Sequence, residues 1–151
     1  MMYYTHLLFA VVFALLLMPF NVSPYIAFPL ILLGGVFPDI DSPGSFIGRK
    51  LRPLNIAVTS LVKHRGIFHT IWFVLAVYFG FFFFAKQYLI YANLFLMGYF
   101  SHLLIDGFTI QGINFFHPFA KLHLSGFIET NTTAEKVLAI VLFILIIFLI
   151  F

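Results

Sequence analysis

Three short segments of this chain place histidine or aspartate among apolar residues. The pairs are, in order, Asp39 and Asp41 in "FPDIDSPG", His64 and His69 in "HRGIFHT", and His102 and Asp106 in "SHLLIDG". Carboxylates and imidazoles supply the oxygen and nitrogen ligands that zinc, manganese and iron accept in proteins. If the fold brings these segments together, the residue types predict a site for a divalent metal ion.

The pair formed by His102 and Asp106 ends a long apolar stretch. Because the two residues are four apart, they share one face of a helix, and Gly98 one turn earlier leaves room for a neighbouring helix. An ionisable residue inside a membrane segment costs on the order of 3 kcal/mol, and such residues usually face a bundle interior or a functional site. Taken alone, the pair is equally compatible with a metal-free hydrogen bond between the two side chains.

The other polar residues also have structural explanations. Asp39 and Asp41 follow a predicted helix end, where aspartate is a common turn residue. His64 and His69 are five residues apart and do not share a helical face, so we expect His64 in a turn and His69 inside the helix that follows. The alternative is a basic cluster that contacts lipid head groups. His6, near the start of the first helix, is as compatible with a packing role as with a ligand role.

The composition identifies the class of protein that must position these residues. The 151-residue chain is 63% hydrophobic and only 9% charged, and its apolar residues occur in long unbroken runs, which is typical of an integral membrane protein made of helices. We expect a single all-α domain over residues 1–151. The absence of cysteine excludes disulfides, thiolate metal ligands and a cysteine nucleophile. The formal charge of +3 is assigned to membrane topology, with no nucleic acid as partner.

The hydrophobic runs predict a polytopic bundle of about five apolar helices and one interfacial amphipathic helix. The apolar helices are expected at 3–18, 24–36, 67–85, 88–106 and from about 133 to the end of the chain. The start of the last helix is indicated by Thr132 and Glu135, which match a capping box. Residues 42–65 mix apolar residues with five basic ones, which suits a loop and an amphipathic helix at the membrane surface.

The direction of successive crossings predicts that the polar segments meet. If each apolar helix crosses the bundle in turn, the three segments and His6 all arrive at one end. Seven of the eight Lys and Arg residues fall at that end, Lys86 being the exception, so the positive-inside rule places it, with the N-terminus, in the cytoplasm. The first two helices are short, and the convergence would survive if they only re-entered the membrane.

Four ordered motifs also carry a resemblance to a known family. "THLLFA", "FPDIDSPGSFIGRKL", "HRGIFHT" and "GYFSHLLIDGFTIQGINFFHPF" resemble those of the YdjM-like, LexA-regulated family of membrane-bound metal-dependent hydrolases, over nearly the whole chain. The chain departs from the family pattern at Ser42, Thr70 and His117. That family is in turn distantly similar to the superfamily of zinc-dependent phospholipase C and P1 nuclease, whose helical enzymes hold metals with histidine and aspartate.

The resemblance implies roles for individual residues. One metal ion would be held by His69, His102, Asp106 and one of Asp39 or Asp41. Asp106 would bridge to a second ion that also engages His6. His64 and Arg65 would act as a substrate-contacting or supporting group, and His64 is kept among the candidate ligands. Zinc is the expected ion, with manganese or iron as alternatives, in one or two copies.

These roles predict a hydrolase that acts on a lipid or another amphiphilic phosphoester through metal-activated water. Asp39 or Asp41 would accept the proton, and Arg65 would stabilise negative charge on a phosphoryl oxygen. An ion or metal transporter is the first alternative, although transporters usually bind near the membrane midplane and contain internal repeats. The second alternative is a structural membrane protein with a polar cluster at one end, which predicts that no metal copurifies.

Overall fold

The long apolar runs fold as helices because only a helix satisfies the hydrogen-bonding groups of a lone backbone segment within itself. The computed structural model describes residues 1–18, 21–61, 67–120 and 122–151. Seven α-helices lie in these residues: α1 (Tyr3–Leu17), α2 (Pro24–Val36), α3 (Phe46–Lys50), α4 (Arg52–Leu61), α5 (Ile71–Phe84), α6 (Leu89–Gly107) and α7 (Thr133–Ile150). The predicted all-α class is confirmed.

Short elements connect the helices. The described chain contains three 3-10 turns, η1 (Phe37–Asp41), η2 (Ile67–His69) and η3 (Lys86–Tyr88). It also contains a small antiparallel pair of strands, β1 (Ile113–Asn114) and β2 (His123–Leu124), within the connection between α6 and α7. The sequence patterns did not indicate this pair, because two-residue strands carry no periodicity.

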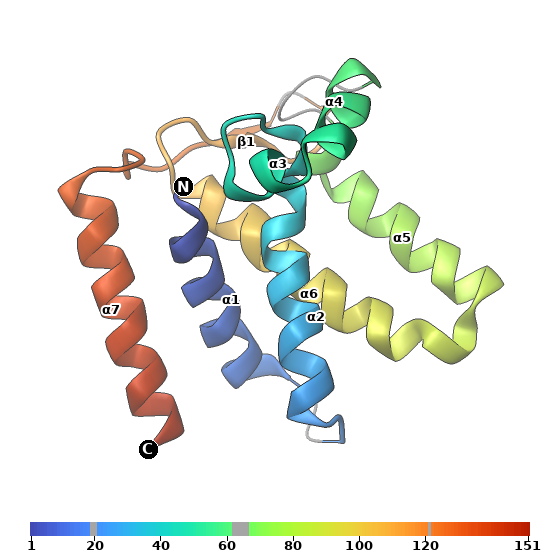
Figure 1. Ribbon diagram of the computed structural model, residues 1–151, viewed down its shortest axis with the longest axis horizontal. Helices are drawn as coiled ribbons and strands as arrows, with labels where there is room; N and C mark the ends of the chain where they lie inside the picture. The colour runs from blue at the N-terminus through green and yellow to red at the C-terminus, as the bar shows by residue number, and fades with distance from the viewer. Residues whose placement is uncertain (19–20, 62–66, 121) are drawn as a thin grey trace.

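The five longer helices alternate in direction as the crossing argument predicted (Figure 1). The N-terminus lies at the same end of the molecule as the short helices α3 and α4 and strand β1, and α2 and α6 both return to that end. The far ends of α1 and α5 and the C-terminus lie at the opposite end. We call the end that holds the N-terminus, α3 and α4 the polar end.

Three helical segments of the described chain are long and apolar enough to cross a membrane. They are Pro24–Asp41, Lys86–Gly107 and Thr133–Ile150, whereas α1 and α5 are shorter apolar helices of 15 and 14 residues. The full-length helix predicted for 67–85 is therefore wrong in its extent. Residues 67–69 form η2 and Thr70 has an extended backbone, so the α-helix begins only at Ile71.

Helices α2 and α6 form the central pair of the bundle. A Cβ atom at Gly98 would overlap the carbonyl oxygen of Ile31, so the backbones approach too closely for any side chain there. Ile31 and Leu94 are buried beside alanines of α1 and α2 in one apolar cluster. The role expected for Gly98 is confirmed, and this contact determines how far His102, one turn further along α6, lies from the end of α2.

Helix α4 lies over the polar end and corresponds to the predicted amphipathic helix. Asn55 is buried, and its side-chain amide donates to the carbonyl oxygen of Ile40 at 2.7 Å, which attaches α4 to η1. Leu54 and Ile56 are exposed. An exposed apolar face beside basic residues suits a helix at the membrane surface.

Candidate metal centre

Six of the predicted ligands come together at the polar end. They arrive on four elements: His6 on α1, Asp39 and Asp41 on η1, His69 on η2, and His102 and Asp106 on α6. Five of the six are at most 1% exposed, and the Asp39 side chain is 19% exposed. The other two predicted site residues, His64 and Arg65, lie outside the described residues.

The first group of possible ligands consists of His69, His102 and Asp106. Oδ2 of Asp106 lies 3.7 Å from Nε2 of His102 and 3.9 Å from Nε2 of His69. One ligand atom from each residue lies within 4.8 Å of the others. Two metal–ligand bonds of about 2.0–2.2 Å span at most about 4.4 Å, so after small side-chain adjustments the three atoms can share one divalent ion.

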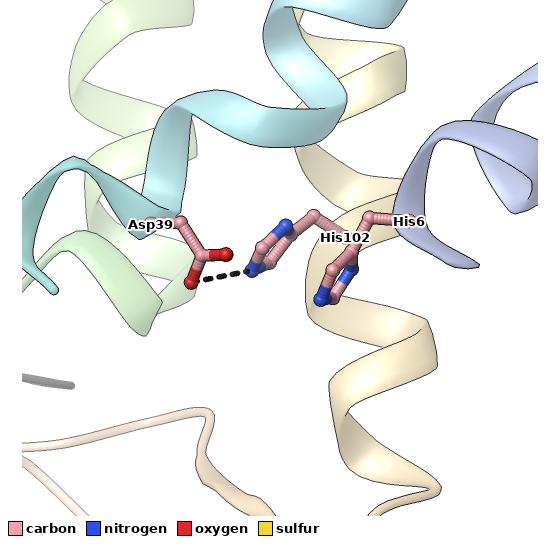
Figure 2. A group of neighbouring side chains, drawn as sticks. All are labelled: His6, Asp39 and His102. Atoms are coloured by element: carbon pink, nitrogen blue, oxygen red, sulfur yellow. Dashed lines mark ion pairs between the residues drawn. The ribbon is translucent and has the colours of Figure 1, made fainter. Parts of the chain in front are cut away.

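The second group consists of His6, Asp39 and His102 (Figure 2). The Asp39 carboxylate points toward the His102 ring, with Oδ1 3.9 Å from Nε2, and the rings of His6 and His102 stack. His102 belongs to both groups, but Nε2 has one lone pair and can bind one ion. The two groups therefore describe either alternative positions for one ion or two ions of which only one is bound by His102.

Asp106 lies between these groups, with its two oxygens on different sides. Oδ1 is 3.5 Å from Nε2 of His6, whereas Oδ2 faces His102 and His69. The α-amino group of Met1 also donates to Oδ1 at 3.1 Å. A carboxylate placed in this way can bridge two cations, because each oxygen has lone pairs directed to its own side.

The tautomer of His102 follows from its hydrogen bond. Nδ1 lies 2.8 Å from the carbonyl oxygen of Gly35. A carbonyl oxygen only accepts, so Nδ1 carries the hydrogen, and in the neutral ring Nε2 presents its lone pair to the carboxylates of Asp39 and Asp106. Among the described residues, neither this nitrogen nor either ring nitrogen of His6 has a hydrogen-bond partner. A buried polar group without a partner costs about 1–3 kcal/mol, and a bound cation would remove that cost.

Asp41 lies behind His69. Its Oδ2 is 3.4 Å from Nδ1 of His69, on the side of the ring away from Asp106. A carboxylate in this position orients an imidazole and raises its basicity as a ligand. Asp39, by contrast, belongs to one of the two ligand groups. The geometry thus separates two carboxylates whose roles the sequence left open.

The backbone around His69 is held by α6 and the loop that follows it. The Tyr99 hydroxyl donates to the carbonyl oxygen of Phe68, and the amide of Ile71 donates to the carbonyl oxygen of Phe115 at 3.0 Å. The expectation that His69 lies inside a helix is wrong, because it is the last residue of η2. The His69 ring therefore reaches the other ligands from η2, before α5 begins.

Glu135 is a buried acidic residue whose contacts the sequence did not predict. Its Oε1 accepts from the Met2 amide at 2.6 Å and from the Thr5 hydroxyl at 2.9 Å, and its Oε2 accepts from the Asn131 amide at 2.5 Å. The predicted capping box is wrong in its partners, since the Thr132 hydroxyl donates to the carbonyl oxygen of Glu129. Glu135 instead attaches α7 to the first turn of α1, next to His6.

The remaining described histidines do not join the cluster. His117 and His123 are exposed in the connection between α6 and α7, and Nδ1 of His123 lies 3.1 Å from the side-chain oxygen of Asn114.

The sequence contained a signal for the buried position of Glu135. It is an acidic residue in the first turn of an apolar helix that starts at the polar end. An ionisable residue in an apolar helix is also what drew attention to His102 and Asp106.

Comparison with known proteins identifies a matching family, whereas no solved structure matches. The family model described as YdjM inner membrane protein matches residues 1–151. "Uncharacterized protein YvsG" of Bacillus subtilis is 31% identical over 108 residues, which cover 69% of this chain and 65% of the relative. "Inner membrane protein YdjM" of Escherichia coli is 29% identical over 124 residues, 75% of this chain and 63% of the relative. The matches thus span just under two thirds of these relatives, and no solved structure matches the chain.

Proposed function

The chain belongs to the YdjM inner membrane protein family, and on that premise we propose that it is a membrane-embedded, metal-dependent hydrolase. Its substrate would be a phosphoester of a lipid or another amphiphile. One observation carries the proposal: buried imidazole nitrogens of His6 and His102 face the Asp39 and Asp106 carboxylates and, within the described residues, have no hydrogen-bond partner. A divalent cation satisfies both kinds of group at once.

The donor set fits zinc, with manganese or iron as alternatives. His69, His102 and Asp106 would hold one ion. A second ion would be held by His6, Asp39 and the other oxygen of Asp106, which lies on that side. Asp41 would orient His69, and the Gly35 carbonyl would orient His102.

A divalent ion bound here would lower the pKa of a coordinated water to about 7 and so supply a nucleophile at neutral pH. Asp39 has the most exposed side chain of the cluster, and its carboxylate oxygen that is not bound to the ion would accept a proton from water that enters from outside. Asp41 is buried against His69 and serves orientation instead. Arg65, which lies outside the described residues, remains the group predicted to stabilise negative charge on a phosphoryl oxygen.

We further propose that the polar end faces the cytoplasm. Among the described Lys and Arg residues, all but Lys86 belong to segments at that end, and such an excess is typical of the cytoplasmic side. A site at this level of the bundle is at the depth of lipid head groups. A lipid could therefore present its polar group to the site while its tails stay in the bilayer.

The test is elemental analysis of the purified protein together with a screen of lipid phosphoesters. The intact protein should retain zinc or another transition metal, whereas Asp106→Ala and His69→Ala should lose it, and His123→Ala is the matched control in an exposed histidine. If the intact protein binds no transition metal after reconstitution, the proposal fails. Metal without hydrolysis of any phosphoester would contradict the enzymatic part and favour transport or a structural role.

A further inference from the structure

A cavity of about 250 Å³ lies directly beside the metal centre. Its wall is formed by the first three residues of the chain, by residues between 39 and 49, and by Gln111 and Thr130 of the connection before α7. Asp39 is the only one of the six clustered ligands on this wall. The other five are almost fully buried, so among the six it is Asp39 that a molecule in this cavity would meet.

The cavity is polar and contains one basic side chain. Among the described residues on its wall, Arg49 is the only Lys or Arg, and Ser42, Ser45, Gln111 and Thr130 contribute neutral polar groups. A guanidinium binds phosphate through two parallel hydrogen bonds. Pockets for drug-sized ligands measure about 300–1,000 Å³, so this cavity suits a small head group and not a whole lipid.

The position of Arg49 relative to Asp39 is held by a compact set of contacts. The Ser45 hydroxyl donates to the carbonyl oxygens of Asp39 at 2.7 Å and of Ser42 at 2.9 Å, and its oxygen accepts from the Gly48 amide at 2.9 Å. A Cβ at Gly48 would overlap the carbonyl oxygen of Ser42, so α3 lies directly on this turn. Ser45 thereby links the backbone of a candidate metal ligand to the helix that carries Arg49.

We propose that this cavity binds the phosphate of a small phosphorylated head group and that Arg49 is its anion-recognition residue. The inference rests on the proposed function for the presence of the metal ion beside Asp39, but it concerns binding and does not require turnover. Apart from Arg49, the only charged side chain on the described wall is the carboxylate of Asp39, which would be engaged by the ion. Arg49 therefore determines selectivity for anionic over neutral substrates.

A neighbouring hollow provides the control. It measures about 470 Å³ and is lined by residues that include Arg49, Arg52, Asn55 and Thr59, but not Asp39. Arg52 is exposed, follows closely in sequence and carries the same charge. A general attraction of anions to the basic surface would involve Arg52 as much as Arg49, whereas recognition in the cavity beside Asp39 would not.

The experiment is calorimetric titration of the metal-loaded, full-length protein with glycerol 3-phosphate, with glycerol as the neutral probe. We expect the wild type to bind glycerol 3-phosphate and not glycerol, Arg49→Ala to bind at least about tenfold more weakly, and Arg49→Lys to be intermediate. Arg52→Ala should bind like the wild type. Equal affinity of Arg49→Ala and wild type, an equal loss in Arg52→Ala, or no binding by the wild type would each overturn the inference. Unchanged metal content in Arg49→Ala and Arg49→Lys verifies that both variants are folded.

Further measurements distinguish a lipid phosphate from a free phosphate, and the binding site from the proposed hydrolase activity. Inorganic phosphate is titrated in parallel, and the protein is mixed with vesicles of phosphatidylcholine with or without phosphatidic acid. A lipid head group is supported if glycerol 3-phosphate and phosphatidic acid vesicles both bind more tightly than inorganic phosphate and if this binding depends on Arg49. A free phosphate is supported if only the binding of inorganic phosphate depends on Arg49. Arg49-dependent binding without hydrolysis would refute the proposed enzyme but not this site. Hydrolysis with a phosphoester KM unchanged in Arg49→Ala would refute this site alone.

Discussion

His6 and His102 stack face to face, with ring centroids 3.8 Å apart and ring planes 9° apart, although they come from α1 and α6. Two imidazolium ions in this arrangement would repel each other, and both rings are buried. The stack therefore favours the neutral rings, which is the form that binds metal ions.

Metal binding should stabilise the protein. Zinc at about 100 times its Kd would stabilise the folded chain by about 2.7 kcal/mol, because it binds the folded state only. A chelator should therefore lower the thermal midpoint in detergent, and added zinc should restore it. His102→Ala removes the nitrogen common to both ligand groups, and the response to zinc should disappear; a full response in this variant would exclude both groups as binding sites.

Glu135→Gln should weaken the connection between α7 and α1. The carboxylate accepts three hydrogen bonds, from the amides of Met2 and Asn131 and from the Thr5 hydroxyl, and an amide side chain has only one oxygen to replace them. We expect a loss of about 1–3 kcal/mol, observed as a lower thermal midpoint. Glu129→Gln, in an exposed residue, is the control and should leave the midpoint unchanged. Equal midpoints for the two variants would show that the buried carboxylate has no such role.

Tyr99→Phe should loosen the turn that carries His69. The change removes the hydroxyl that donates to the Phe68 carbonyl and keeps the ring that stacks on Phe73. The metal affinity should fall by about tenfold or more, as when a supporting group behind a metal ligand is lost. Competition with a chromophoric chelator measures this affinity. Tyr88→Phe, in an exposed tyrosine, is the control, and an affinity equal to that control would contradict the role of Tyr99.

Gly98→Ala should separate α2 from α6. Its Cβ would overlap the Ile31 carbonyl, and such overpacking costs about 1–3 kcal/mol. Gly80→Ala is the matched control, because Gly80 lies in α5 and nothing lies within 4 Å of an added Cβ. The thermal midpoint should fall for Gly98→Ala and stay the same or rise for Gly80→Ala. A midpoint for Gly98→Ala as high as that of Gly80→Ala would show that α2 and α6 tolerate the separation.

Most helix positions could be predicted from the sequence. The bounds of α1, α2, α6 and α7 agree with the hydrophobic runs to within one or two residues, since membrane helices are long and their ends are marked by polar or helix-breaking residues. The error at α5 has a local cause. Residues 67–69 are apolar enough to extend the run, but hydrogen bonds to Phe68 and Ile71 from α6 and the following loop hold them in a separate turn.

The membership of the cluster was also predictable in part. The alternating crossings predict that the segments of His6, Asp39, Asp41, His69, His102 and Asp106 meet at one end, and for His102 and Asp106 the cost of an ionisable residue in an apolar helix adds to that prediction. Glu135 met the same criterion but was interpreted as a helix cap, since local rules take no account of a partner more than 100 residues away. Arg49 was one of several basic residues in its segment, and only the cavity beside Asp39 distinguishes it.

The sequence by itself determined the class of protein, the helical segments and the end of the bundle at which the ionisable residues gather, because hydrophobicity and the direction of crossings depend only on the order of residues. The tertiary structure decided which atoms face each other. It placed Asp39 at the opening and Asp41 behind His69, although the two are neighbours in one short turn, and it directed the two oxygens of Asp106 to different sides. Such distinctions depend on helix rotation and close backbone contacts such as that of Gly98 with Ile31, and these arise only when the helices pack.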